Sequence, residues 1–135
     1  MEQIEVKTIV NAPIGQVWEC WTSPKHIVKW NFASNDWHCP KAENNLTIGG
    51  EFHYLMEAKD GSFSFDFWGT YVNIEQGKYI EILLGDGRKV SVLFELLETQ
   101  TIITEKFTPE TLNTVELQKT GWEMILDNFK LYVEN

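Results

Sequence analysis

The sequence predicts an α+β domain in which a curved antiparallel sheet is wrapped around one long C-terminal helix. Between residues 46 and 107, apolar and polar residues alternate in segments that end at turn dipeptides, which is typical of antiparallel strands. After residue 113 the apolar spacing changes to that of a helix. The chain has 135 residues, 43% of them hydrophobic, which is the size and composition of one folded domain, residues 1–135.

The N-terminal part is predicted to form one strand followed by two short helices. Residues 4–10 alternate as a strand does, and Asn11-Ala12-Pro13 ends it. Proline suits the start of a helix, and the next apolar residues repeat at i, i+3, i+4 and i+7: Ile14, Val17, Trp18 and Trp21. This helix is expected to end near Thr22-Ser23. Pro24 then begins a second short helix that carries Ile27 and Trp30.

Residues 32–45 show no period and are predicted to form a long loop. Loops of this length in a small domain are usually functional or disordered. Phe32 and Trp37 argue against disorder, so we expect an ordered loop with a role at the functional site.

Five further strands are predicted. Asp60-Gly61 and Asp86-Gly87 are dipeptides that tight hairpins prefer, and Gln76-Gly77 and residues 98–100 make weaker breaks. The strands fall near residues 48–58, 62–75, 78–84, 89–98 and 101–107. Because alternate side chains point to opposite faces, one face of each strand should be buried.

The last segment is predicted to be a helix that reaches the C-terminus. Asn113 and Glu116 resemble a capping box at its start. Its apolar residues fall on one side: Leu117, Trp122, Ile125, Leu126, Phe129 and Val133. Gly121 costs about 1 kcal/mol in a helix relative to alanine. A kink, a fresh helix start or a close approach of another backbone is therefore expected there.

Charge and composition exclude several classes of partner. The chain carries 11 basic and 20 acidic residues, a net charge of −9, which argues against nucleic acid or an anionic membrane surface. The N-terminus has no secretory signal pattern, and no apolar run is long enough for membrane insertion. Cys20 and Cys39 are too few for a disulfide framework. We expect a cytoplasmic protein with reduced thiols.

No catalytic or metal-binding constellation stands out. His26, His38, His53 and the two cysteines lack the spacing of metal ligands, so neither a metal nor another cofactor is expected. Asp66 or Glu51 would act as an acid or base if it faced an apolar cavity. The alternation with Phe65 and Phe67 puts Asp66 on the opposite face, toward solvent.

The candidate site is an aromatic cup. An antiparallel sheet must cover its apolar face, and a curved sheet around one helix leaves a wedge that these residues should line: Phe52, Tyr54, Phe65, Phe67, Ile125 and Phe129. Trp122 is a further candidate for ligand contact, although its helical spacing favours packing in the core. Three aromatics near the open end either contact a ligand or plug the opening: Trp30, Phe32 and Trp37. Tyr54 and His38 are the expected polar anchors. Alternatively, the 18 aromatic residues fill the wedge and leave no cavity.

The order and spacing of several motifs resemble one superfamily over nearly the whole chain. The motifs are Ala12-Pro13, Val17-Trp18, Trp21-Thr22-x-Pro24, Trp30, Leu46-x-x-Gly49-Gly50-x-Phe52, Met56, Asp60-Gly61, Gly69-x-Tyr71, Gly121-Trp122, Leu126 and Phe129. This pattern is similar to the START-like, or Bet v 1-like (SRPBCC), superfamily. Within it, the chain resembles small bacterial proteins similar to the C-terminal domain of the heat-shock-protein-90 ATPase activator.

The resemblance implies a helix-grip fold, with a curved antiparallel sheet of six or seven strands around a C-terminal helix and a hydrophobic cavity. Relatives in the superfamily bind lipids, sterols, polyketides and other apolar molecules, and some are cyclases or aromatases. Eukaryotic activators also carry an N-terminal chaperone-binding domain, for which these 135 residues offer no counterpart. A chaperone partner is therefore the least favoured expectation.

Three functions remain open. The first is binding of a small apolar ligand, lipid-like, polyketide-like or planar and aromatic, with no covalent step. The second is a cyclase or hydratase that uses His38, Tyr54 or Asp66 as proton carriers. The third is a protein-interaction domain related to co-chaperones. A fold alone does not choose among them.

Overall fold

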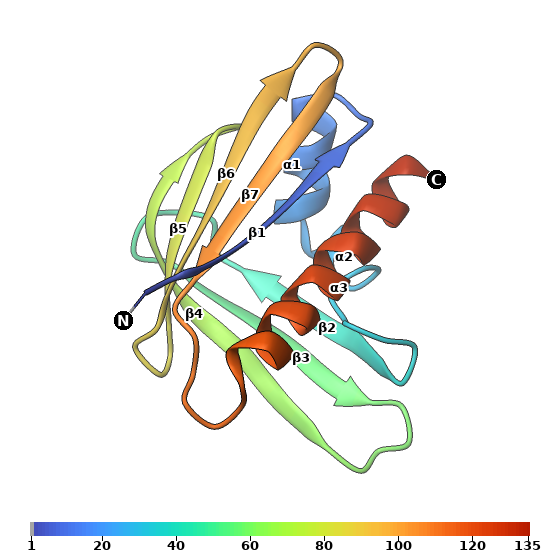
Figure 1. Cartoon of the computed structure of the whole chain (residues 1–135), viewed down its shortest axis with the longest axis vertical. Helices are drawn as coiled ribbons and strands as arrows, with labels where there is room; N and C mark the ends of the chain where they lie inside the picture. The colour runs from blue at the N-terminus through green and yellow to red at the C-terminus, as the bar shows by residue number, and fades with distance from the viewer. Residues whose placement is uncertain (1) are drawn as a thin grey trace.

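Within residues 2–135, which the computed structural model describes, seven strands form one antiparallel sheet that curls around a long helix (Figure 1). The elements in chain order are β1 (Ile4–Val10), α1 (Ile14–Thr22), α2 (Pro24–Ile27), β2 (Trp37–Asn44), β3 (Glu51–Ala58), β4 (Ser64–Glu75), β5 (Tyr79–Leu84), β6 (Lys89–Leu97), β7 (Gln100–Phe107) and α3 (Val115–Glu134). This is the α+β helix-grip architecture that the sequence and the resemblance predict.

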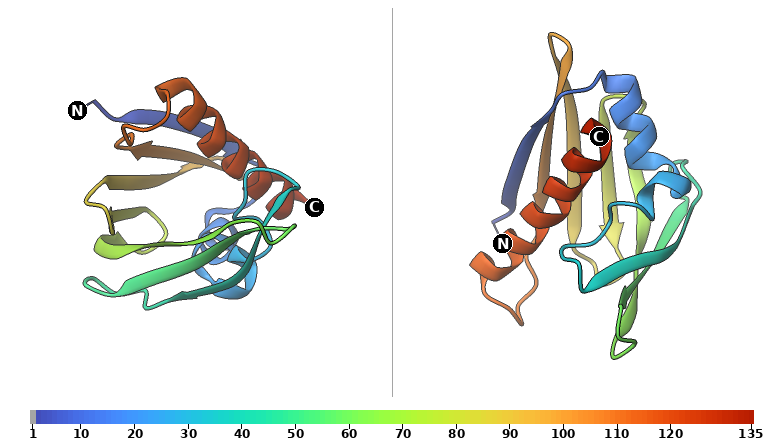
Figure 2. Two further views of the ribbon diagram at one scale, coloured as in Figure 1. Left: turned by 90° about the horizontal axis from the view of Figure 1, so that it is seen from below. Right: turned by 90° about the vertical axis from the view of Figure 1, so that its right-hand side faces the viewer.

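The strand order is β1-β7-β6-β5-β4-β3-β2, and each neighbouring pair is antiparallel. Strands β2 to β7 therefore follow one another as hairpins, whereas β1 pairs with β7 at the far edge, with Ile4 opposite Phe107 and Val10 opposite Thr101. Helices α1 and α2 carry the chain from the β1 edge to the β2 edge. Helix α3 lies inside the curl and packs against β1 and α1 (Figure 2).

The loop predicted over residues 32–45 is wrong in its second half, where the chain forms strand β2. Its alternation is hidden for two physical reasons. Pro40 lies inside the strand, which is tolerated because β2 is an edge strand. The pairing with β3 also shifts register between His38 and Lys41, so the side-chain pattern changes phase within the strand.

The start of α3 also differs from the prediction by one residue. Thr114, not Asn113, is the N-cap, and its hydroxyl oxygen accepts a hydrogen bond from the Leu117 amide at 3.1 Å. The helix runs through Gly121 without a restart, and a Cβ there would meet nothing within 4 Å. Neither a fresh helix start nor a close backbone approach accounts for this glycine.

The core lies between the concave face of the sheet, α1 and α3. Val10, Val17, Ile27, Ile103 and Phe129 have no exposed surface. These buried side chains are concentrated where α1 meets the sheet and the C-terminal half of α3. No helix in the described part of the chain is both long and apolar enough to cross a lipid bilayer.

Candidate functional site

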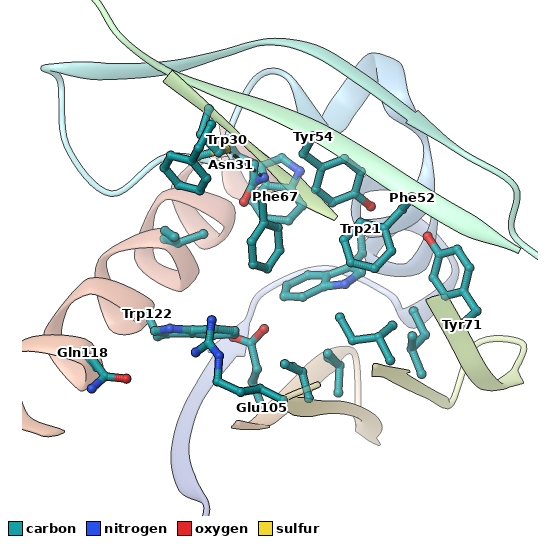
Figure 3. Close-up of a pocket in the computed structure, with 18 of the residues that line it drawn as sticks. Trp21, Trp30, Asn31, Phe52, Tyr54, Phe67, Tyr71, Glu105, Gln118 and Trp122 are labelled. Carbon is teal, nitrogen blue, oxygen red and sulfur yellow. Dashed lines mark hydrogen bonds between the residues drawn. The ribbon is translucent and has the colours of Figure 1, made fainter. Parts of the chain in front are cut away.

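A cavity of about 330 Å³ lies between the concave face of the sheet and the N-terminal half of α3 (Figure 3). Its lining comes from nearly every element: Trp21, Thr22, Trp30, Asn31, Phe52, Tyr54, Met56, Phe65, Phe67, Tyr71, Ile80, Ile82, Arg88, Val90, Val92, Glu105, Glu110, Asn113, Gln118, Trp122 and Ile125. Most of these side chains are apolar, and a few polar groups interrupt them. That composition is typical of pockets for small organic molecules.

Seven of the residues predicted from the sequence line this cavity: Trp30, Phe52, Tyr54, Phe65, Phe67, Trp122 and Ile125. Strands β3 and β4 bring four of them together because alternate residues of both strands face the same side. Phe52 and Tyr54 of β3 pair with Gly69 and Phe67 of β4. The rings of Phe52 and Tyr54 lie 4.9 Å apart, centre to centre.

Four predicted residues lie outside the lining, two of them because β2 replaces the expected loop. Trp37 begins β2 and packs edge-on against Phe63 and Phe65, with ring centres 6.0 Å apart in each case. His38 pairs with Glu57 across β2 and β3, with its Nε2 2.9 Å from a carboxylate oxygen. Neither residue is part of the cavity lining.

The other two lie nearer the packed end of the molecule. Phe32 follows α2, and its carbonyl accepts a hydrogen bond from the Asn128 side chain of α3. Phe129 is fully buried, and its ring meets those of Trp21 and Trp30 edge to face at 4.9 and 4.8 Å. Phe129 belongs to the core, one helical turn beyond the last cavity residue of α3.

Trp122 both packs and lines the cavity. One face of its indole stacks on Phe107 of β7, with ring centres 4.1 Å apart and planes 7° from parallel. The rings of Trp122 and Phe67 of β4 lie edge to face, with centres 6.4 Å apart and planes at 76°. The indole is therefore held in one orientation by the sheet and forms one wall of the cavity (Figure 3).

A group of hydrogen-bonded side chains closes the end of the cavity near α1. Asn44 donates to the main-chain oxygen of Thr22 at 2.8 Å and to the Tyr71 hydroxyl at 3.2 Å. Burial, and then the neighbouring Tyr71, raise the pKa of Tyr54 well above its usual range. Burial likewise raises the pKa of Tyr71, so both hydroxyls are neutral at physiological pH. Figure 3 shows the two tyrosines near Phe52.

The opposite rim is formed by the turn before β6 and the loop before α3. Arg88 is held by Asp86, with Nε 2.7 Å from a carboxylate oxygen. The Gln118 side chain donates to the carbonyls of Glu110 and Asn113 at 3.0 and 2.9 Å and accepts from the Glu110 amide. These contacts fix the loop against α3 and give the rim a defined shape.

Glu105 of β7 is an acidic residue of the lining, as is Glu110 at the rim, and Figure 3 labels Glu105. Only 8% of its surface is exposed, and it lies between Val6 of β1 and Val92 of β6 in the sheet register. Burial raises the pKa of this carboxyl from its usual value to about 8. At neutral pH the group is a protonated acid in an apolar wall.

Sequence reasoning missed Glu105, although the signal was present. Thr101, Ile103 and Phe107 share its parity on β7, and all three are fully buried. A glutamate between Ile103 and Phe107 therefore had to face inward unless the strand bulged. The apolar Ile102 on the other face of the strand made the alternation less clear. Trp21 and Tyr71 were also missed as lining residues.

The other acids considered from the sequence lie on the convex side of the sheet. Asp66 and Glu51 both bind His53, at 2.8 and 2.9 Å, and all three side chains are substantially exposed. The hydrogen bonds from Asp66 and then Glu51 raise the pKa of His53. Asp66 thus faces away from the cavity, as its parity predicts, and does not serve there as a proton carrier.

The two cysteines are buried and not joined to each other. Burial is the largest influence on each thiol and raises the pKa of both. A thiol in such surroundings is a poor nucleophile because little thiolate is present at neutral pH.

Comparison with known proteins identifies the family. Residues 11–134 match the family described as Activator of Hsp90 ATPase homolog 1-like protein. The chain is 41% identical to an AHSA1-like protein from Aeromonas hydrophila, with a TM-score of 0.93, and the match covers 98% of this chain and 92% of that one. A protein from Cytophaga hutchinsonii is 48% identical over the same shares, with a TM-score of 0.86.

More distant structures share the fold alone. A protein from Nitrosomonas europaea has a TM-score of 0.82 at 18% identity, with 96% of this chain and 92% of that one covered. No match was found among curated proteins.

Proposed function

The chain belongs to the Activator of Hsp90 ATPase homolog 1-like family, and we propose that it binds a small apolar molecule in the cavity between the sheet and α3. The fold is one that commonly binds ligands in a cavity. The observation that carries the proposal is the cavity itself, with aromatic walls and few polar groups.

The size of the cavity supports a compact ligand. Pockets for small molecules span about 300–1,000 Å³, and this one, at about 330 Å³, is at the lower limit. The flat walls formed by Trp122, Phe67 and Phe52 favour a planar molecule of two or three rings. Such a ligand would gain roughly 25 cal/mol per Å² of apolar surface that leaves water.

The lining of the cavity and the net charge also argue against other functions. Of the three proton carriers considered for a cyclase or hydratase, His38 and Asp66 lie outside the cavity lining, and Tyr54 is held neutral by burial. The net charge of −9 favours a small uncharged partner over a nucleic acid. We therefore propose ligand binding without a covalent step.

The first experiment asks whether the cavity takes an apolar molecule. A hydrocarbon probe, 2-isopropenylnaphthalene, is titrated into ¹⁵N-labelled protein, and the indole N–H signals are followed. We expect the signals of Trp21, Trp30 and Trp122 to shift and those of Trp37 and Trp68 to stay, because only the first three line the cavity. Native mass spectrometry of freshly purified protein would reveal a ligand retained from the cell.

A matched pair of variants locates the binding. Val92→Phe projects a ring into the cavity, whereas Val72→Phe adds the same ring at a valine that is 47% exposed and absent from the lining. We expect at least a tenfold weaker affinity for the probe in the first variant and no change in the second. Equal affinity in both variants, or no shift in any of the three cavity indoles, would contradict the proposal.

A further inference from the structure

Glu105 lacks a partner where one would be expected. Across residues 2–135 its carboxyl has no hydrogen bond and no opposing charge close enough to influence it. The carboxyl is not sealed inside the core: no side-chain oxygen of the described residues is both fully buried and without a hydrogen bond, so its oxygens keep surface that is open to the cavity. Only 8% of the residue is exposed and it borders the cavity, so the space in front of the carboxyl is where a partner would lie.

The other charged groups of the lining are already engaged. Arg88 is paired with Asp86 and reaches the Thr108 carbonyl. The Glu110 carboxylate accepts from the Asn113 amide and side chain at 2.7 and 3.2 Å.

The elements packed around Glu105 bring no further charge to it. Its neighbours across the sheet, Val6 and Val92, are apolar. The charged residues beside Val6 on β1, Glu5 and Lys7, and those nearest Trp122 on α3, Lys119 and Glu123, are all exposed to solvent. Tyr54 and Tyr71 are the remaining titratable groups of the lining, and burial raises the pKa of both.

We propose that Glu105 is the polar anchor of the cavity, a neutral acid that donates its hydrogen to an uncharged acceptor on the ligand, such as a ketone, ester or amide carbonyl. This inference rests on the proposed function and specifies the ligand: a planar apolar body that carries a carbonyl oxygen. The apolar walls accept the body, and the unpaired acid supplies the single directional contact that orients it.

The geometry favours a neutral acceptor over a cation. A ligand ammonium would require Glu105 to ionise between Val6 and Val92, and the pair would then have to offset the desolvation of two charges. A carbonyl requires no ionisation, because burial keeps the proton on Glu105 up to a pH of about 8. A carboxylate ligand would likewise leave a charge in this apolar space.

The test compares two probes of nearly equal shape, 2-acetylnaphthalene and 2-isopropenylnaphthalene, which differ by an oxygen in place of a methylene group. One hydrogen bond contributes about 1 kcal/mol, so at pH 6.5 we expect the ketone to bind about fivefold more tightly. The preference should disappear at pH 9, where Glu105 loses its proton. The affinity of the hydrocarbon should not rise with pH.

Two variants separate the roles of shape and hydrogen bonding. Glu105→Gln keeps a donor in the same place and cannot ionise, so the ketone preference should persist at pH 9. Glu105→Leu removes the donor, and the preference should be absent at both pH values. If Glu105→Leu fails to fold, the pH dependence of the ketone preference in the wild type and in Glu105→Gln still tests the proposal.

The outcomes distinguish this inference from the proposed function. If both probes bind the cavity with equal affinity at pH 6.5, the proposed ligand site is supported and the proposed role of Glu105 is wrong. If 2-(aminomethyl)naphthalene binds more tightly than the ketone, and more so as the pH rises toward 9, Glu105 is an anchor for cations instead. If neither naphthalene probe shifts the cavity indoles, both proposals fail.

Discussion

The two ends of the space between the sheet and α3 use the same kind of side chain for different purposes. At the end near α1, the ring of Phe129 is closed in by Trp21 and Trp30 and has no exposed surface. At the other end, Phe65 and Phe67 border an open cavity, and Phe65 is 45% exposed. An aromatic-rich sequence therefore does not reveal by itself whether its rings fill a core or line a pocket.

The difference arises from what covers each end. Helix α1 lies over the sheet beside the C-terminal half of α3, so a second helix supplies the rings that fill the space there. The N-terminal half of α3 packs against the sheet through Trp122 and Phe107, and the opposite wall is formed by β3 and β4. Trp21 and Trp30 form the boundary, because each packs on Phe129 and also lines the cavity.

The largest expected effect is at the packed end. Phe129→Ala should lower the free energy of unfolding by about 3–5 kcal/mol, because it leaves a void among rings that cannot close on it. Urea denaturation followed by circular dichroism measures this loss. The matched substitution at the open end, Phe67→Ala, should cost about 1–2 kcal/mol, since that ring already borders open space. Equal losses would show that the two ends do not differ in packing.

The next effect concerns pH. The pKa of Glu105 is raised from 4.5 to about 8 by burial, so the folded state holds a proton that the unfolded state releases above pH 4.5. Its contribution to stability is complete below pH 4.5 and declines by roughly 1.4 kcal/mol per pH unit as the pH rises toward 8. Above pH 8 the contribution of Glu105 to stability no longer changes.

Glu105→Gln should remove this component. The free energy of unfolding of the variant, relative to the wild type, should rise steadily between pH 5 and pH 8 in parallel urea titrations. Asp66→Asn, an acid on the convex face, is the control and should leave the pH profile in this window nearly unchanged. A constant difference between Glu105→Gln and the wild type over the whole range would mean that Glu105 is already ionised at pH 5.

The smallest expected effect lies in the helix that joins the two ends. Gly121→Ala should raise the free energy of unfolding by about 1 kcal/mol, because alanine favours the helix and its Cβ meets no neighbour. The thermal midpoint should increase while the affinity for 2-isopropenylnaphthalene stays the same. A loss of affinity would reveal that the glycine serves the cavity, and a loss of stability would contradict the free space found around this position.

Much of the fold could be predicted because its signals are local. Asp60-Gly61 and Asp86-Gly87 occupy the predicted turns, and alternation placed Phe52, Tyr54 and Met56 on one face of β3. Strand β2 could not be recognised from the sequence, because Pro40 and the register shift hide its alternation. Its pairing with β3 is what stabilises this segment as a strand. The cap of α3 was misplaced by one residue because Asn113 and Thr114 are both good N-cap residues.

Part of the candidate site could also be predicted because its sequence signals are local. Parity along β3 and β4 identifies their residues on the concave face, and parity along β7 would also have identified Glu105. It does not tell whether a concave residue meets another side chain or an empty space. Phe67 and Phe129 each lie on the apolar face of their own element, yet the first lines the cavity and the second lies in the core.

The sequence by itself determined the elements that depend on neighbours along the chain: the hairpins, the inward face of each strand and the apolar side of α3. The tertiary structure alone decided where the aromatic side chains leave room, because that depends on how α1 and α3 sit within the curl of the sheet. It also decided the protonation of Glu105. Burial by distant parts of the chain, here β1 and β6, raises the pKa of this carboxyl, and the sequence around residue 105 does not contain that information.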